Sequence, residues 1–210
     1  MRSNAYDFAR KIEGRIEALR DEQFHERPRP AKRLIEELYP FSRFALAVKQ
    51  SGLNVEVEAF ENSGRADGEI WITGFLERTF EVQVTYAAYE QSDALRSRLL
   101  VQDGFAPGAG PISKDRKTGK ITAIMEAEDM DAQIKKLGAS ISDRIRRKIA
   151  NDSCIPGTVL LVAFDEVKLR GRGWWSILYS AIDAAGGINK GPFSQVFLFN
   201  GCSNELQQAA

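Results

Sequence analysis

The stretch LNVEVEAFENSGRADGEIWITGFLERTFEVQVT, residues Leu53 to Thr85, decides the fold expected of this chain. Apolar and polar residues alternate over Leu53–Ala59 and again over Phe80–Thr85, and a short apolar run, Ile70–Ile72, lies between them. A period of two residues is typical of a half-buried β-strand. Because the connections are short and contain turn residues such as Asn62-Ser63-Gly64, the stretch predicts three strands paired as an antiparallel meander.

Helical patterns lie on both sides of this meander. Helices are predicted, in chain order, over Tyr6–Glu26, Ala31–Leu38, Phe41–Gln50, Tyr89–Leu100, a long segment that Asp129 or Asp131 caps and that runs to Ile149, and Trp174–Ala185. Pro28 and Pro30 are expected to end the first helix, and Pro40 the second. Two mostly apolar runs, Thr158–Phe164 and Gln195–Phe199, predict strands covered on both faces. The order predicts an α/β fold with a mixed central sheet flanked by helices.

The 210 residues suit a single domain over 1–210, with a helical segment at about 1–50. A Gly- and Pro-rich insertion at about 101–128 is expected to form a long loop with a small hairpin at Lys120–Met125. Its lysines and arginines fit either a flap that faces substrate or a plain surface loop.

Composition limits the possible functions. Lys plus Arg and Asp plus Glu number 29 each, so no overall field attracts a polyanion, which argues against a general nucleic-acid coat protein. The single histidine, His25, argues against Ser-His or Cys-His pairs and against multi-histidine metal sites. The two cysteines suggest neither a disulfide framework nor a zinc site. No apolar run has membrane-spanning length and no secretory signal is evident, which predicts a cytoplasmic protein without a membrane partner.

Chemistry is expected where the second and third strands of the meander meet. Alternation places Glu81 and Gln83 on the same side of the third strand, and Asp67 begins the second. Antiparallel pairing brings Asp67 toward the later part of the third strand, so two carboxylates and an amide oxygen can converge. Mg²⁺ or Mn²⁺ prefers such ligands and activates water. The alternative is an ordinary solvated sheet face.

With these residues, Asp67 followed by Glu81-Val82-Gln83, the chain resembles the PD-(D/E)xK (restriction-endonuclease-like) nuclease superfamily. The resemblance covers roughly residues 31–164 and is mainly one of element order: a helix, a three-strand meander, a helix and a further strand. No proline precedes Asp67, and Gln83 stands at the position of the usual lysine.

The resemblance implies a restriction-endonuclease-like fold and site. Asp67 and Glu81 would bind the metal, Val82 would offer only its backbone carbonyl, and Gln83 would orient water. An upstream helical glutamate commonly joins such sites, and Glu37 is the choice here. Lys49 is a candidate for the missing positive charge.

Two further features suggest nucleic acid. Basic residues lie on the polar side of the long predicted helix, where they fit either phosphate contacts or a solvated face: Lys135, Lys136, Arg144, Arg146, Arg147 and Lys148. Trp174 and Trp175 fit either base stacking or packing of a helix on the sheet.

The leading hypothesis is a metal-dependent nuclease that acts on DNA, with a homodimer as the form able to cut both strands. The alternatives are a noncatalytic binding or interaction protein on the same fold, with a degenerate site, and an unrelated α/β domain.

Overall fold

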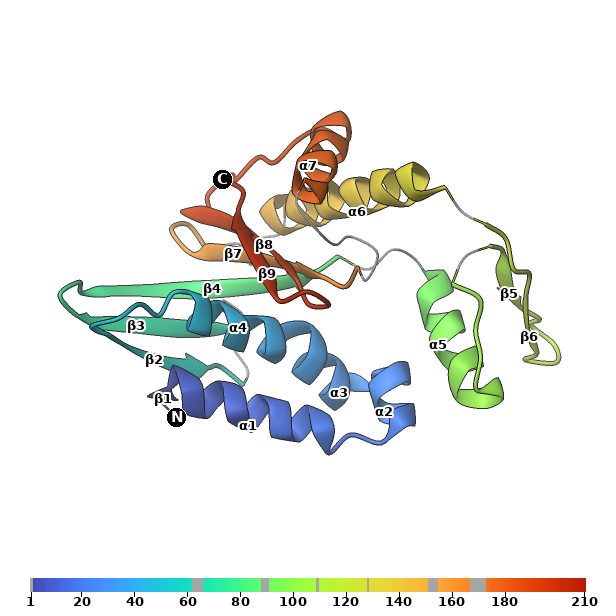
Figure 1. The fold of residues 1–210 in the computed structure, drawn as a ribbon, viewed down its shortest axis with the longest axis horizontal. Helices are drawn as coiled ribbons and strands as arrows, with labels where there is room; N and C mark the ends of the chain where they lie inside the picture. Colours follow the sequence, from blue (N-terminus) through green and yellow to red (C-terminus); the bar gives the residue numbers. More distant parts are fainter. Residues whose placement is uncertain are drawn as a thin grey trace.

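A computed structural model describes residues 2–61, 66–87, 91–108, 110–127, 129–150, 155–166 and 173–210 of the chain. A seven-stranded mixed sheet, in the order β1-β2-β3-β4-β7-β8-β9, forms its centre (Figure 1). The strands are β1 (Ser3–Asn4), β2 (Leu53–Ala59), β3 (Gly68–Gly74), β4 (Arg78–Tyr86), β7 (Val159–Phe164), β8 (Gln195–Asn200) and β9 (Glu205–Gln208). The predicted meander β2-β3-β4 is antiparallel, whereas β7 pairs parallel to both β4 and β8.

Helices cover the two faces of the sheet. They are α1 (Ala5–Glu17), α2 (Asp21–Glu26), α3 (Arg29–Arg33), the π-helix η1 (Leu34–Leu38), α4 (Tyr39–Ala47), α5 (Gln91–Asp103), α6 (Met130–Ala150) and α7 (Trp174–Ala184). One apolar core lies between α1, α4 and the sheet, and a second lies between the sheet and the pair α6 and α7. Figure 1 shows these two helical layers on opposite sides of the strands. The prediction of an α/β fold with a mixed sheet flanked by helices is confirmed.

The helix boundaries near the N-terminus differ from the prediction. The expected first helix is interrupted, because α1 ends at Glu17 and α2 begins at Asp21. The expected stop before Pro40 is wrong: α3, η1 and α4 run on without a break, with Pro40 in the first turn of α4. The Tyr39 N–H bonds the Leu34 carbonyl in the wider π pattern, and such a bulge accommodates a proline that a regular α-helix excludes.

The long helix and the tryptophans agree with the packing interpretation. In α6, Ile134, Leu137, Ile141 and Ile145 are buried, which confirms the predicted apolar stripe. Trp174 is buried, and its ring lies edge-on to Phe164 of β7 and stacks on Trp175. These contacts attach α7 to the sheet, so the base-stacking alternative has no support from the geometry.

The insertion is more ordered than expected. It contains a hairpin of β5 (Ile112–Lys114) and β6 (Ile121–Ala123), so the expected hairpin at Lys120–Met125 covers only the second strand. Arg96 of α5 donates to the Pro107 and Gly110 carbonyls and thereby holds α5 against the chain before β5. In Figure 1 this unit projects away from the sheet beyond the ends of β4 and β7.

Candidate functional site

A polar cleft of about 620 Å³ lies at the carboxyl ends of β4 and β7. Its wall is formed by side chains from α2 to η1, the end of β4, α5, α6 and the residue after β7: His25, Glu26, Arg27, Lys32, Glu36, Glu37, Val84, Thr85, Tyr86, Ala87, Asp93, Ala94, Ser97, Arg144, Lys148 and Asp165. The carboxyl ends of parallel strands are the usual place for ligands in open α/β sheets. The position and polarity of this cleft make it the candidate functional site.

Asp67 is fixed beside β4 next to the cleft. It precedes Gly68, whose partner across the strands is Val82, so Asp67 lies level with Gln83. Its N–H donates to the Val82 carbonyl over 2.9 Å, and its Oδ2 accepts from the Val84 N–H over 2.6 Å. These two bonds hold the carboxylate at a fixed point, partly buried behind the cleft wall.

Glu37 of η1 is the second carboxylate here. Burial raises the pKa of Glu37, and so does the negative charge of Asp67, while Arg33 and Lys148 act to lower it. Burial also raises the pKa of Asp67, against the effects of the Val84 N–H, Lys148 and Arg33. Arg33 Nε lies 3.6 Å from the Glu37 carboxylate. Arg33 of α3, Glu37 of η1, Asp67 just before β3 and Lys148 of α6 therefore influence one another electrostatically, and we call these four residues the carboxylate cluster.

Glu81 and Gln83 have different surroundings. Glu81 pairs with Glu69 across the strands, and the Glu81 charge adds to burial in raising the pKa of Glu69. It is two residues before Gln83, about 7 Å along the strand, and so lies farther from Asp67 than Gln83 does. Gln83 is only 1% exposed and pairs with Leu160 of β7. A neutral amide suits this position, since burial opposes the charge of a lysine.

The basic residues of α6 divide into two groups. Arg144 and Lys148, four residues apart and so on one helix face, line the cleft. Arg147 is exposed outside it and pairs with Asp143 at 2.7 Å, and Lys135 and Lys136 are exposed nearer the start of α6. The structure thus brings two of the six basic residues predicted to contact nucleic acid, Arg144 and Lys148, to the candidate site.

Lys49 lies elsewhere. Its Nζ donates to the Leu53 carbonyl over 3.2 Å and lies above the Tyr6 ring, at the other end of β2 from the cleft. The positive charge beside Asp67 comes instead from Lys148 and Arg33.

Sequence reasoning missed a hydrogen-bonded network in the cleft wall. The Tyr86 hydroxyl donates to Asp165 Oδ2 over 2.5 Å, and Arg27 lies 3.4 Å from the same oxygen and 3.2 Å from Glu36. Burial, followed by the charge of Asp165, raises the pKa of Tyr86, which keeps its hydroxyl protonated as a donor. The position of Asp165, directly after an apolar predicted strand, was the available signal, since parallel strands present ligand-binding groups at their carboxyl ends.

The carboxylate cluster offers only a small number of protein ligands for Mg²⁺. Glu37 and Asp67 supply two carboxylates, and Mg²⁺ sites in proteins often use one or two carboxylates and retain several waters. Among the described residues, no group of three or more His, Cys, Asp or Glu side chains is arranged to hold a metal ion. The residues present therefore fit a hydrated hard cation and not a full protein cage.

No protein-family model matches this chain, and neither a curated protein nor a solved structure matches it. In the described part of the chain, no helix combines the length and apolar character needed to cross a membrane.

Proposed function

We propose that the protein is a metal-dependent phosphodiesterase that acts on nucleic acid, with DNA as the leading candidate substrate, and that the polar cleft is its active site. The feature that carries the proposal is the carboxylate cluster: Asp67 is fixed by the Val84 N–H, Arg33 lies 3.6 Å from the Glu37 carboxylate, and burial together with the Asp67 charge raises the pKa of Glu37. Two carboxylates held close together disfavour their own ionisation. A divalent cation relieves this repulsion.

Support also comes from the order of elements. A helix, a three-strand antiparallel meander and a parallel strand after a further helix make up the core expected of the PD-(D/E)xK superfamily, and Asp67 directly precedes the second strand of that meander. In the proposed site Glu37 and Asp67 hold the metal. When bound, Mg²⁺ supplies Lewis-acid polarisation of the phosphate.

The cations of the cleft are assigned to the substrate. Arg144 and Lys148 bind the phosphate backbone by charge-assisted hydrogen bonds. Lys148 also offsets negative charge beside the two carboxylates, the role that a neutral Gln83 cannot fill. Glu81 lies farther along the strand and is assigned no role in this site.

Calorimetry with Mn²⁺ and Mg²⁺ tests the proposal. Wild type is expected to bind one ion in the cleft, and the isosteric variants Asp67→Asn and Glu37→Gln are expected to lose binding. Glu81→Gln is the matched control, because it removes the same charge from the same sheet outside the cluster, and it should bind as wild type does. Loss of binding in Asp67→Asn and Glu81→Gln, with Glu37→Gln binding as wild type does, would assign the metal to Asp67 and Glu81 instead. No binding by wild type, with or without DNA, would refute the proposal.

A noncatalytic nucleic-acid-binding protein is the second candidate. The buried, neutral Gln83 and the set of only two carboxylates favour it. Cleavage of a labelled DNA duplex or single strand with Mn²⁺ separates the two functions. Binding in the cleft without cleavage would assign the protein to this second class.

A further inference from the structure

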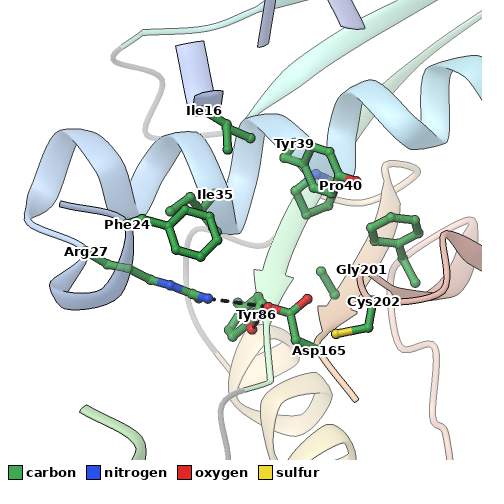
Figure 2. Close-up of a pocket in the computed structure, with 12 residues that line it drawn as sticks. Ile16, Phe24, Arg27, Ile35, Tyr39, Pro40, Tyr86, Asp165, Gly201 and Cys202 are labelled. Atoms are coloured by element: carbon green, nitrogen blue, oxygen red, sulfur yellow. Dashed lines mark hydrogen bonds and ion pairs between the residues drawn. The ribbon is translucent and has the colours of Figure 1, made fainter. Parts of the chain in front are cut away.

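A second cavity, of about 320 Å³, adjoins the polar cleft and shares Arg27, Tyr86 and Asp165 with it (Figure 2). Pockets that hold small molecules begin at roughly this size, about 300 Å³. The two cavities are therefore neighbouring compartments that meet at the Tyr86 and Asp165 network.

Apolar and aromatic side chains form most of this second cavity. Phe24 of α2, Ile35 of η1, Tyr39 of α4 and Phe199 of β8 contribute to its wall. Tyr39 and Phe199 lie edge to face, with ring centroids 6.3 Å apart, and the Tyr39 hydroxyl bonds Asn204. Rings fixed in this way offer flat surfaces to a planar ligand without further loss of side-chain freedom.

The polar end of the cavity contains a hydrogen-bond acceptor, the carboxylate of Asp165. Oδ2 of Asp165 accepts hydrogen bonds from Tyr86 and Arg27, whereas Oδ1 lies against Gly201 and accepts no hydrogen bond from the described residues. In Figure 2 the Arg27 side chain extends across the base of the cavity toward Asp165. The Arg27 guanidinium lies between two carboxylates, Glu36 and Asp165, and Lys32 lies 3.9 Å from Glu36, so two cations offset these two carboxylates. Because Asp165 Oδ1 is an acceptor, this end of the cavity suits a ligand with an N–H donor.

We propose that this cavity binds the base of a purine nucleotide whose phosphate lies in the polar cleft. The ring packs among the aromatic and aliphatic side chains, as bases stack on aromatic residues elsewhere, and a base N–H donates to Asp165 Oδ1. The phosphate is directed to the cleft, whose wall contains Arg144, Lys148 and Lys32, the last of which lies 3.9 Å from Glu36. The phosphate half of this inference rests on the proposed function, and the base half stands on the cavity alone.

The test uses the full chain and three probes in calorimetry: AMP, adenosine and ribose 5-phosphate. Cys202 is exposed and lines the cavity, so Cys202→Trp fills the space from a surface turn, and Cys202→Ser keeps it open as the matched control. AMP and adenosine are expected to bind wild type and Cys202→Ser, and Cys202→Trp should weaken both by at least about tenfold. Ribose 5-phosphate should bind all three proteins alike. Phe24→Ala, which removes a half-exposed wall residue, should also weaken AMP and guards against misfolding of the tryptophan variant.

Each failure points to a different half of the inference. If AMP and ribose 5-phosphate bind equally and adenosine does not bind, the base pocket is refuted and the phosphate cleft stands. If adenosine binds in a Cys202→Trp-sensitive way but wild type binds no metal and cleaves no nucleic acid, the pocket stands and the proposed function fails. If no probe binds, or if Cys202→Trp binds AMP as wild type does, the inference is overturned.

Discussion

Gly138 in the middle of α6 provides a test of how the second core is packed. A Cβ added there would lie 2.8 Å from the Ala181 carbonyl carbon, 2.9 Å from the Ala181 Cβ and 2.9 Å from the Ile182 nitrogen, all on α7. Two of these three atoms are backbone, so the contact is relieved only if one helix moves. Gly138 therefore marks a close approach of α6 and α7, and Gly138→Ala is expected to destabilise the protein.

The magnitude follows from two opposed effects. Alanine is favoured over glycine inside a helix by about 1 kcal/mol. Overpacking a core typically costs about 1–3 kcal/mol, and the backbone contacts place Gly138→Ala in the upper half of that range. The free energy of unfolding should therefore fall by about 1–2 kcal/mol. Gly14→Ala in α1 is the control, because its added Cβ would meet no atom within 4 Å, and it should stabilise by about 0.5–1 kcal/mol.

Urea unfolding followed by far-ultraviolet circular dichroism measures both variants. A change of 1 kcal/mol shifts the melting temperature of a domain of this size by about 2–4 °C, so thermal unfolding gives an independent reading. The two alanines should move stability in opposite directions. If Gly138→Ala stabilises as much as Gly14→Ala does, α6 and α7 do not pack as described, and the placement of the cleft residues carried by α6 loses its basis.

Three further predictions concern the cleft. Burial and a neighbouring carboxylate raise the pKa of Glu37 in the folded state, so the wild type loses stability as the pH rises through that pKa. Glu37→Gln should therefore have a higher melting temperature than wild type at pH 7, and this difference should shrink toward pH 4. A difference in melting temperature that is constant with pH would contradict this prediction. Lys148→Ala should weaken DNA binding regardless of base sequence, and in filter binding it should reduce the slope of log affinity against log salt concentration by about one. Arg147 is paired with Asp143 outside the cleft, so Arg147→Ala should weaken DNA binding less. Equal losses in the two variants would argue against the cleft as the phosphate site. Tyr86→Phe removes a hydrogen bond to the Asp165 carboxylate and should cost about 1.5–3 kcal/mol in chemical denaturation; a neutral result would place that hydroxyl in water.

Local sequence patterns determined the main elements of this protein. The alternation over residues 53–85 specifies the meander because side chains in a strand point to opposite faces, a property of the backbone that needs no distant partner. The apolar stripe of α6 and the apolar run of β7 were equally evident, since in each the spacing of apolar residues predicts which side chains are buried. The continuation of the helix through Pro40 was not evident from the sequence, because the π-turn that accommodates this proline depends on how η1 packs on the sheet and α1.

Only the tertiary structure decided which polar residues meet. Asp67, Glu81 and Gln83 were expected to converge, with Glu37 joining them. The strand register sets Asp67 level with Gln83, and the packing of η1 and α6 adds Glu37 and Lys148 to its electrostatic surroundings. Residues 37, 67 and 148 are far apart in sequence, and no local pattern encodes their separation. Convergence depends on register and on the angles at which helices cross the sheet. The sequence by itself thus determined the elements and the faces that they bury, and long-range packing determined the site.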